Sequence, residues 1–171
     1  KFIKDKSIDG LISNAGSGKL DSLENFSPKQ ISEYINLNLN SHIIITRLLL
    51  PYFKTINNGF LIYIGSEASY KVGKYGSIYS ACKFGLRGFV KSIRIETSLN
   101  NIKVTQINPG IVKTPFYNNI KISPGTEPDE FIEPNDISDV IIDVLKMRKG
   151  TVIDEINLTS QKKIVTFKRK N

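Results

Sequence analysis

The chain has 171 residues, of which 40% are hydrophobic and 23% are charged, and it contains one cysteine. These values are typical of one globular domain, and a single cysteine excludes both a disulfide framework and a four-cysteine metal site. The net charge of +8 includes a basic tail with Lys162, Lys163, Lys168, Arg169 and Lys170. No nucleic-acid-binding signature accompanies this tail, so we interpret it as a solvated chain end.

Short apolar runs alternate along the chain with stretches of helical periodicity. The apolar runs predict strands and the periodic stretches predict helices. In chain order we expect a strand over 9–13, a helix over 28–56, a strand over 60–64, a helix over 77–99, a strand over 102–107, a helix from 135 to 147 and a strand over 152–158. This alternation predicts a single α/β domain, 1–171, with a doubly wound parallel sheet that carries helices on both faces.

The segment 111–134 contains four prolines and does not fit either pattern. Long irregular segments inside a compact domain are often functional. We therefore interpret 111–134 as a lid over the substrate. Its aromatic residues Phe116, Tyr117 and Phe131 suggest an apolar or mixed pocket.

Three predicted strands end in small or polar residues. The first is followed by Asn14-Ala15-Gly16, the second by Gly65-Ser66 and the third by Pro109-Gly110. In a doubly wound fold, ligands bind beyond the carboxyl ends of the parallel strands. We expect these three strand ends to converge on one ligand-binding crevice.

Tyr79 and Lys83 are four residues apart within a predicted helix, so they share one face of it. A tyrosine phenol is a weak base at neutral pH, and a nearby cation favours its phenolate. The pair is therefore a candidate proton-transfer device. A tyrosine and a lysine at this spacing also occur by chance on solvated helices, so the pair needs further support.

That support comes from four motifs that occur in order. The chain resembles the short-chain dehydrogenase/reductase family in the Asn14-Ala15-Gly16 turn, in Ser66 placed thirteen residues before Tyr79, in Tyr79-x-x-x-Lys83, and in the Pro109-Gly110 motif that ends at Thr114. The resemblance implies a Rossmann-like fold, of which this chain holds strands four to seven. It also implies an active-site asparagine in the long helix, for which Asn38 fits best and Asn36 and Asn40 are alternatives.

The resemblance also implies roles for these residues. Tyr79 exchanges a proton with the substrate, Lys83 lowers the pKa of Tyr79 and binds the nicotinamide ribose, Ser66 orients the substrate oxygen, and Asn38 positions a water. The implied catalytic residues are Asn38, Ser66, Tyr79 and Lys83. The implied cofactor-binding residues are Asn14, Ala15, Gly16, Tyr79, Lys83, Pro109, Gly110, Val112 and Thr114.

The implied function is NAD(P)-dependent oxidoreduction of a ketone or secondary alcohol, with NADP slightly preferred over NAD. The alternative is a catalytically silent relative that acts by binding another protein. We expect a small carbonyl or alcohol substrate, no metal, no nucleic acid and no membrane. We also expect a cytoplasmic homodimer or homotetramer that pairs through helices 28–56 and 77–99.

The chain departs from the family pattern at its start. The glycine-rich phosphate loop and the strands around it, about 60–80 residues, are not found before the first strand. We therefore expect the chain to be part of a longer enzyme, and to bind dinucleotide poorly by itself. Near the site, we expect Glu67 to point away and His42 to pack or to face solvent.

Overall fold

The structure, a computed structural model, describes residues 7–118 and 120–167. Its centre is a four-stranded parallel sheet in the order β1-β2-β3-β5. The strands are β1 (Gly10–Ser13), β2 (Gly59–Ile64), β3 (Ile102–Pro109) and β5 (Glu155–Leu158). This arrangement confirms the predicted Rossmann-like α/β fold.

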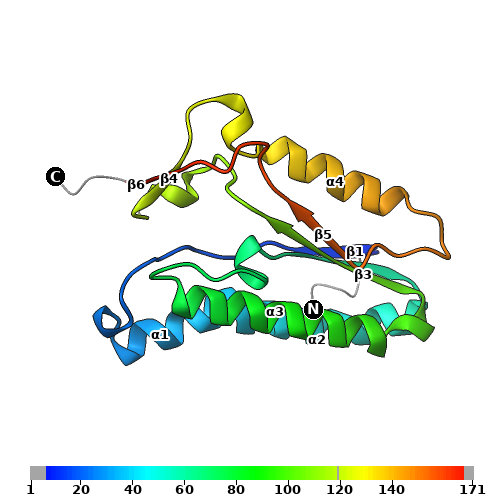
Figure 1. Ribbon diagram of the computed structural model, residues 1–171. Coiled ribbons are helices and arrows are strands. Elements are labelled where there is room, and N and C mark those ends of the chain that lie inside the picture. The colour runs from blue at the N-terminus through cyan, green and yellow to red at the C-terminus, as the bar shows by residue number, and fades with distance from the viewer. Residues whose placement is uncertain (1–6, 119, 168–171) are drawn as a thin grey trace.

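Helices cover both faces of the sheet (Figure 1). On one face lie α1 (Pro28–Ile35), α2 (Ser41–Ile56) and α3 (Ser77–Glu96), and on the other lies α4 (Pro134–Lys146). The predicted helix over 28–56 is present, but a π-helical turn over Asn36–Asn40 separates α1 from α2. Within the described residues, 3-10 turns lie at Leu23–Asn25, Glu67–Ser69, Ser98–Asn100, Pro115–Tyr117 and Pro128–Glu130.

The core follows from the period-two alternation of the strands. On β2, Leu61 and Tyr63 are fully buried against α2 and α3, in a cluster with Phe53 and Leu86. The intervening Ile62 faces the other way and packs with the cluster under α4. Both faces of the central strands are therefore apolar, as expected for a parallel sheet covered on both sides.

Several predicted boundaries were wrong by a few residues. α4 begins at Pro134, and its N-cap is Glu133 rather than Asn135, because Asp136 accepts a hydrogen bond from the Glu133 main-chain N–H in a capping box. α3 ends at Glu96, where a 3-10 turn takes over. β5 begins at Glu155 rather than at residue 152, because its pairing with β3 begins with Glu155 opposite Gln106.

The segment 111–134 is held at both ends. A parallel bridge joins Val112 to Ile132, and the main chain of Lys113 donates to the carbonyl of Ile132 at 2.9 Å. Within the segment, β4 (Ile122–Pro124) pairs antiparallel with β6 (Val165–Phe167). The C-terminal part of the chain therefore lies against the predicted lid.

The predicted solvated tail is only partly within the described residues. Lys162 forms an ion pair with Asp129 at 2.8 Å, and Lys163 lies 4.0 Å from Glu67. These two lysines are therefore tied to the body of the domain, while Lys168, Arg169 and Lys170 lie outside the described residues. Over residues 7–118 and 120–167, no helix combines the length and the apolar character needed to cross a membrane.

Candidate active site

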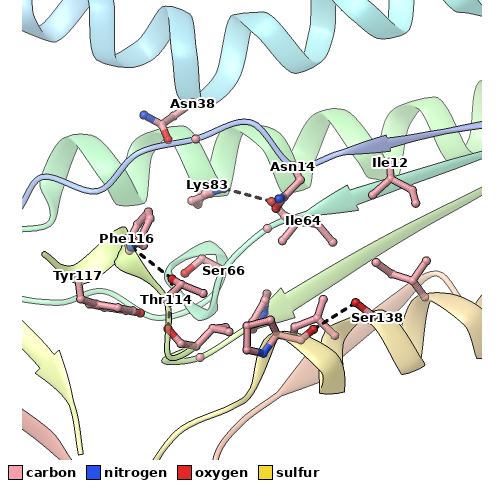
Figure 2. A pocket seen from close by; sticks show the side chains of 18 of the residues that line it. Ile12, Asn14, Asn38, Ile64, Ser66, Lys83, Thr114, Phe116, Tyr117 and Ser138 are labelled. Atoms are coloured by element: carbon pink, nitrogen blue, oxygen red, sulfur yellow. Dashed lines mark hydrogen bonds between the residues drawn. The ribbon is translucent and has the colours of Figure 1, made fainter.

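A cavity of about 480 Å³ lies at the carboxyl ends of β1, β2 and β3. Figure 2 shows Asn14, Ser66, Lys83 and Thr114 around it, each on a different segment of the chain. The other predicted site residues that line this cavity are Gly16, Asn38, Tyr79, Pro109, Gly110 and Val112. Ala15 is the one predicted site residue that does not line it. The strand ends therefore converge as the sequence predicted.

Lys83 is buried, with only 5% of its surface exposed. Its Nζ donates to the carbonyl of Ile64 at 3.2 Å, the one acceptor that the described residues provide for it. Burial disfavours the ammonium and lowers the pKa of Lys83 to about 8. An ammonium has three donors, so this group can bind further acceptors in the cavity.

Tyr79 is one helical turn before Lys83, whose Nζ lies 5.7 Å from the centre of the Tyr79 ring. Burial raises the pKa of Tyr79, and a side-chain hydrogen bond with Ser66 opposes that increase. The net shift is therefore opposite to the one expected from Lys83 alone, because desolvation of the phenolate dominates. Tyr79 is held as a neutral phenol that can donate a proton.

Ser66 is the N-cap of the 3-10 turn Glu67–Ser69. Its Oγ accepts from the main-chain N–H of Ala68 at 3.1 Å, which fixes the hydroxyl and leaves its proton available for donation. Behind the turn, Ser69 Oγ lies 2.7 Å from the Ser66 carbonyl oxygen and 3.0 Å from Asn108 Oδ1, so its one proton is shared between these two acceptors. Asn108, on β3, thereby anchors the turn that carries Ser66.

Asn38 is fully buried in the π-helical turn. Its Nδ2 donates to the carbonyl of Tyr34 at 3.0 Å, and its Oδ1 accepts from the main-chain N–H of Ser17 at 3.1 Å. The side-chain amide thus replaces part of the regular helical hydrogen bonding and ties the helix to the loop after β1. A Cβ on Gly16 would lie 3.1 Å from Asn38 Oδ1, so a glycine there eases this close approach.

The aromatic residues of the segment 111–134 close over Tyr79. The ring of Phe116 lies 6.3 Å from that of Tyr79 and 5.2 Å from that of Tyr117, measured between centroids. A Cβ on Gly18 would lie within 2.5 Å of Phe116 Cζ, so only glycine lets the loop after β1 meet this ring. Phe131, also predicted to line the pocket, is instead buried beneath Lys113.

A second cavity, of about 280 Å³, shares Ser66 and Tyr79 with the first. We call it the side pocket. Glu67 does not line the main cavity, but it contributes to the wall of the side pocket. The reason is the 3-10 turn after Ser66, which Glu67 begins, and which holds its carboxylate 3.5 Å from Lys71 Nζ.

Sequence reasoning missed the contribution of α4 to the main cavity. Pro134, Ile137, Ser138 and Ile141 line it from the first turns of that helix. The Ser138 hydroxyl donates to the carbonyl of Pro134 at 3.3 Å. The surface that α4 presents to the cavity is therefore mostly apolar. The helical spacing of these residues was visible in the sequence, but it does not say which end of the sheet they reach. Among the described residues, no cluster suited to a metal ion occurs.

His42, one turn after Asn38, is fully buried, and its Nδ1 lies 2.6 Å from Ser13 Oγ. Burial and repulsion from Lys83 lower its pKa to about 4, from 6.5. The unfolded chain therefore binds a proton between pH 6.5 and 4 that the folded chain does not, so stability falls as the pH falls through this window. The full loss in the free energy of unfolding is about 3 kcal/mol.

We predict that His42→Gln reduces this acid sensitivity. Urea unfolding at several pH values between 6.5 and 4 measures it, with the wild-type chain losing about 3 kcal/mol more than the variant across the window. The variant need not be as stable as the wild type, because only the slope against pH is compared. Parallel pH profiles for the two proteins would show that His42 does not titrate in this way.

The doubly wound sheet, with a cavity at the carboxyl ends of its strands, defines the class of α/β proteins that bind ligands at that edge. Within that class, residues 3–124 match the family described as short chain dehydrogenase. This match covers most of the chain, so the protein belongs to the short-chain dehydrogenase family.

Known proteins agree with this assignment. The chain is 30% identical over 155 residues to sepiapterin reductase of Chlorobaculum tepidum, covering 88% of this chain and 61% of the relative. It is 30% identical over 153 residues to an NADP-dependent 3-hydroxy acid dehydrogenase of Schizosaccharomyces pombe, covering 85% and 59%. The chain therefore spans about three fifths of the length of these two relatives.

Solved structures share the fold. An alcohol dehydrogenase from the archaeon Thermococcus sibiricus, complexed with 5-hydroxy-NADP, has a TM-score of 0.80 at 25% identity, covering 92% of this chain and 65% of that one. A 3-ketoacyl-(acyl-carrier-protein) reductase from Brucella melitensis, complexed with NADH, has a TM-score of 0.81 at 19% identity, covering 92% and 68%. The second likeness concerns the fold alone.

Proposed function

We propose that the protein is an NAD(P)-dependent oxidoreductase that interconverts a ketone and a secondary alcohol. The observation that carries the proposal is the meeting of Ser66, Tyr79 and Lys83 at one cavity beyond the strand ends. The Tyr79 ring and the Lys83 ammonium are one helical turn apart, and the side chains of Ser66 and Tyr79 form a hydrogen bond. Family membership supports the same reaction class.

In the direction of reduction, Tyr79 donates its phenolic proton to the carbonyl oxygen. Burial keeps that proton in place until the substrate oxygen gains negative charge. Ser66 donates a second hydrogen bond to the same oxygen, and preorganised donors of this kind stabilise the charge that develops on it. In the reverse direction the same two groups bind an alcohol, and Tyr79 receives its proton.

Lys83 stabilises the tyrosinate that remains after proton transfer, because a fixed cation lowers the free energy of a nearby anion. Its approximate pKa of 8 also leaves it able to lose a proton near neutral pH. We propose that Asn38 holds the helix open at the π-helical turn, where a water can connect Lys83 to solvent. The buried side chain of Asn38 and its two hydrogen bonds support this positioning role.

The cavity suits the nicotinamide end of a dinucleotide. The buried Lys83 ammonium has donors beyond the one used by Ile64, and hydroxyl groups of a ribose provide matching acceptors. The residues proposed to hold this end are Asn14, Ala15, Gly16, Tyr79, Lys83, Pro109, Gly110, Val112 and Thr114. The bound nicotinamide would supply the hydride. NADP is preferred because the similar proteins include an NADP-dependent dehydrogenase and an alcohol dehydrogenase complexed with 5-hydroxy-NADP.

We also propose that 111–134 acts as the substrate lid and that two copies pair through α1–α2 and α3. The exposed side chains of Ile44, Leu48 and Phe84 support such pairing, with 56%, 53% and 43% of their surfaces accessible. Leu49 and Phe89, on the same helices, pack in the core instead. The single cysteine, Cys82, is free and buried, which suits the reducing cytoplasm.

The test is turnover by the full-length protein. We expect absorbance of NADPH to fall when a panel of ketones and aldehydes is added, and to rise with NADP and the corresponding secondary alcohols. NADH and NAD in parallel assays give the cofactor preference. Protein that binds NADPH but turns over no member of the panel would contradict the proposal and favour the silent, protein-binding alternative.

A further inference from the structure

The side pocket opens from the same Ser66 and Tyr79 that line the main cavity, so a molecule whose carbonyl lies between these two hydroxyls extends into it. Much of its wall is apolar. These wall residues come from the loop after β1, the segment 111–134 and β6, and include Leu20, Ile111, Phe116, Ile120 and Val165. The pocket therefore accepts an apolar body next to the reacting carbon.

The charges on this pocket are unequal. Lys71 and Lys74 line it, and Lys163 lies at its edge beside Glu67. Glu67 Oε2 lies 3.5 Å from Lys71 Nζ and 4.0 Å from Lys163 Nζ, so one carboxylate serves two ammonium groups. Among the described residues, Lys74 has no carboxylate within ion-pair distance, and its Nζ lies 5.0 Å from the centre of the Tyr75 ring. The group keeps an excess of two positive charges.

The lysines also affect one another. Lys71 and Lys163 both approach the Glu67 carboxylate, and the proximity of Lys71 lowers the pKa of Lys163. Like charges held together at the mouth of an apolar pocket are relieved by a bound anion. A lysine supplies a mobile point charge on a flexible stem, so it can follow an anionic group over a range of positions.

Resting on the proposed function, we propose that the side pocket selects carbonyl substrates that carry a carboxylate, so the protein is a reductase of oxo acids. The carbonyl binds at Ser66 and Tyr79, the apolar body fills the pocket, and the carboxylate reaches Lys71 and Lys74. Phe116 and Tyr117, which lie beside Ser66 in Figure 2, form the wall along which the body passes.

Matched pairs of substrates, with and without the carboxylate, test the proposed selectivity. The full-length protein is assayed with NADPH, a series of oxo acids of increasing length and their methyl esters, which keep the shape and remove the charge. We expect kcat/KM to be about tenfold higher for the best acid than for its ester, which corresponds to one charge interaction of about 1.4 kcal/mol. Added salt lowers this ratio, because exposed charges are screened.

Two double variants assign the effect to the pocket. Lys71→Gln with Lys74→Gln brings the acid-to-ester ratio close to one. Lys29→Gln with Lys146→Gln removes the same charge from exposed positions elsewhere, each paired with a neighbouring acid, and retains the wild-type ratio. Esters used as well as acids by the wild type, or a ratio unchanged in the pocket variant, would overturn the inference and leave the proposed function standing.

A direct measurement of binding separates failure of the proposed function from failure of this inference. If no carbonyl compound is turned over, the proposed function fails, and calorimetric titration of wild type and pocket variant with an oxo acid still decides the inference. Tighter binding of the acid than of its ester, lost in the pocket variant, supports the anion site. Equal binding of the acid by both proteins rejects it.

Discussion

Tyr79→Phe is expected to reduce turnover by about 100- to 10 000-fold, the range that a positioned general acid contributes. Phenylalanine keeps the ring that packs against Tyr34 and Phe116, so the fold and the cavity are retained. Only the proton donor and its hydrogen bond to Ser66 are lost. Steady-state rates with NADPH and the best carbonyl substrate measure the effect, and fluorescence titration with NADPH checks that cofactor binding persists.

The matched control is Tyr75→Phe, which removes a phenolic hydroxyl from a half-exposed tyrosine on the loop before α3. The contacts of Lys74 and Lys121 with Tyr75 are to its ring, which phenylalanine also provides. We expect turnover within about twofold of wild type, as surface changes away from special features have small effects. Retained turnover in Tyr79→Phe would remove Tyr79 as the proton donor.

Lys83→Met is expected to abolish turnover and at the same time to stabilise the fold. Burial of an ammonium with no anionic partner lowers the folded pKa to about 8 from 10.5, so the folded state disfavours the charge at every pH below about 8. That cost is about 3 kcal/mol. Methionine has a similar length and no charge, and it loses only the hydrogen bond to Ile64. The net gain is about 1–2 kcal/mol.

Urea unfolding of the two proteins at a series of pH values measures this gain. The advantage of the variant is full at neutral pH and shrinks as the pH rises from about 8 to 10.5, where the unfolded wild-type chain also loses its proton. Lys91→Met, on the same helix but 61% exposed, is the control and should change stability little. A variant less stable than the wild type at neutral pH would contradict the prediction.

These predictions describe a site that is maintained at some cost in stability. The side chains of Lys83 and His42 are both buried, and burial lowers the pKa of each because it disfavours the charged form. Both side chains lie beside the loop after β1. Burying an unpaired cation destabilises the fold, but makes that cation more effective toward an anion that forms beside it.

Some features of the site were predictable because they depend on local geometry. Tyr79 and Lys83 share a face because four residues make about one helical turn, and that holds in any helix. Ser66 reaches the same cavity because parallel strands in a doubly wound sheet end at one edge. Ser27 begins its helix through a capping box with Gln30, a contact between residues only three positions apart.

Other features were outside the reach of local patterns. The direction of the Tyr79 pKa shift depends on how much surrounding structure excludes water, and spacing contains no measure of burial. Phe116 and Tyr117 line both cavities, whereas Phe131 is buried. The sequence did not distinguish the three, because an irregular segment has no period from which to read the direction of a side chain.

The sequence by itself determined the fold class and the order of the elements, because both depend on periodicity and on turn residues. The four residues proposed for the chemistry followed from the resemblance of its motifs to the short-chain dehydrogenase/reductase family. Only the tertiary structure decided the π-helical turn at Asn38, the approach of α4 to the cavity and the meeting of Lys71 with Lys163 at Glu67. These depend on contacts between segments distant in sequence, which are set by packing of the whole chain.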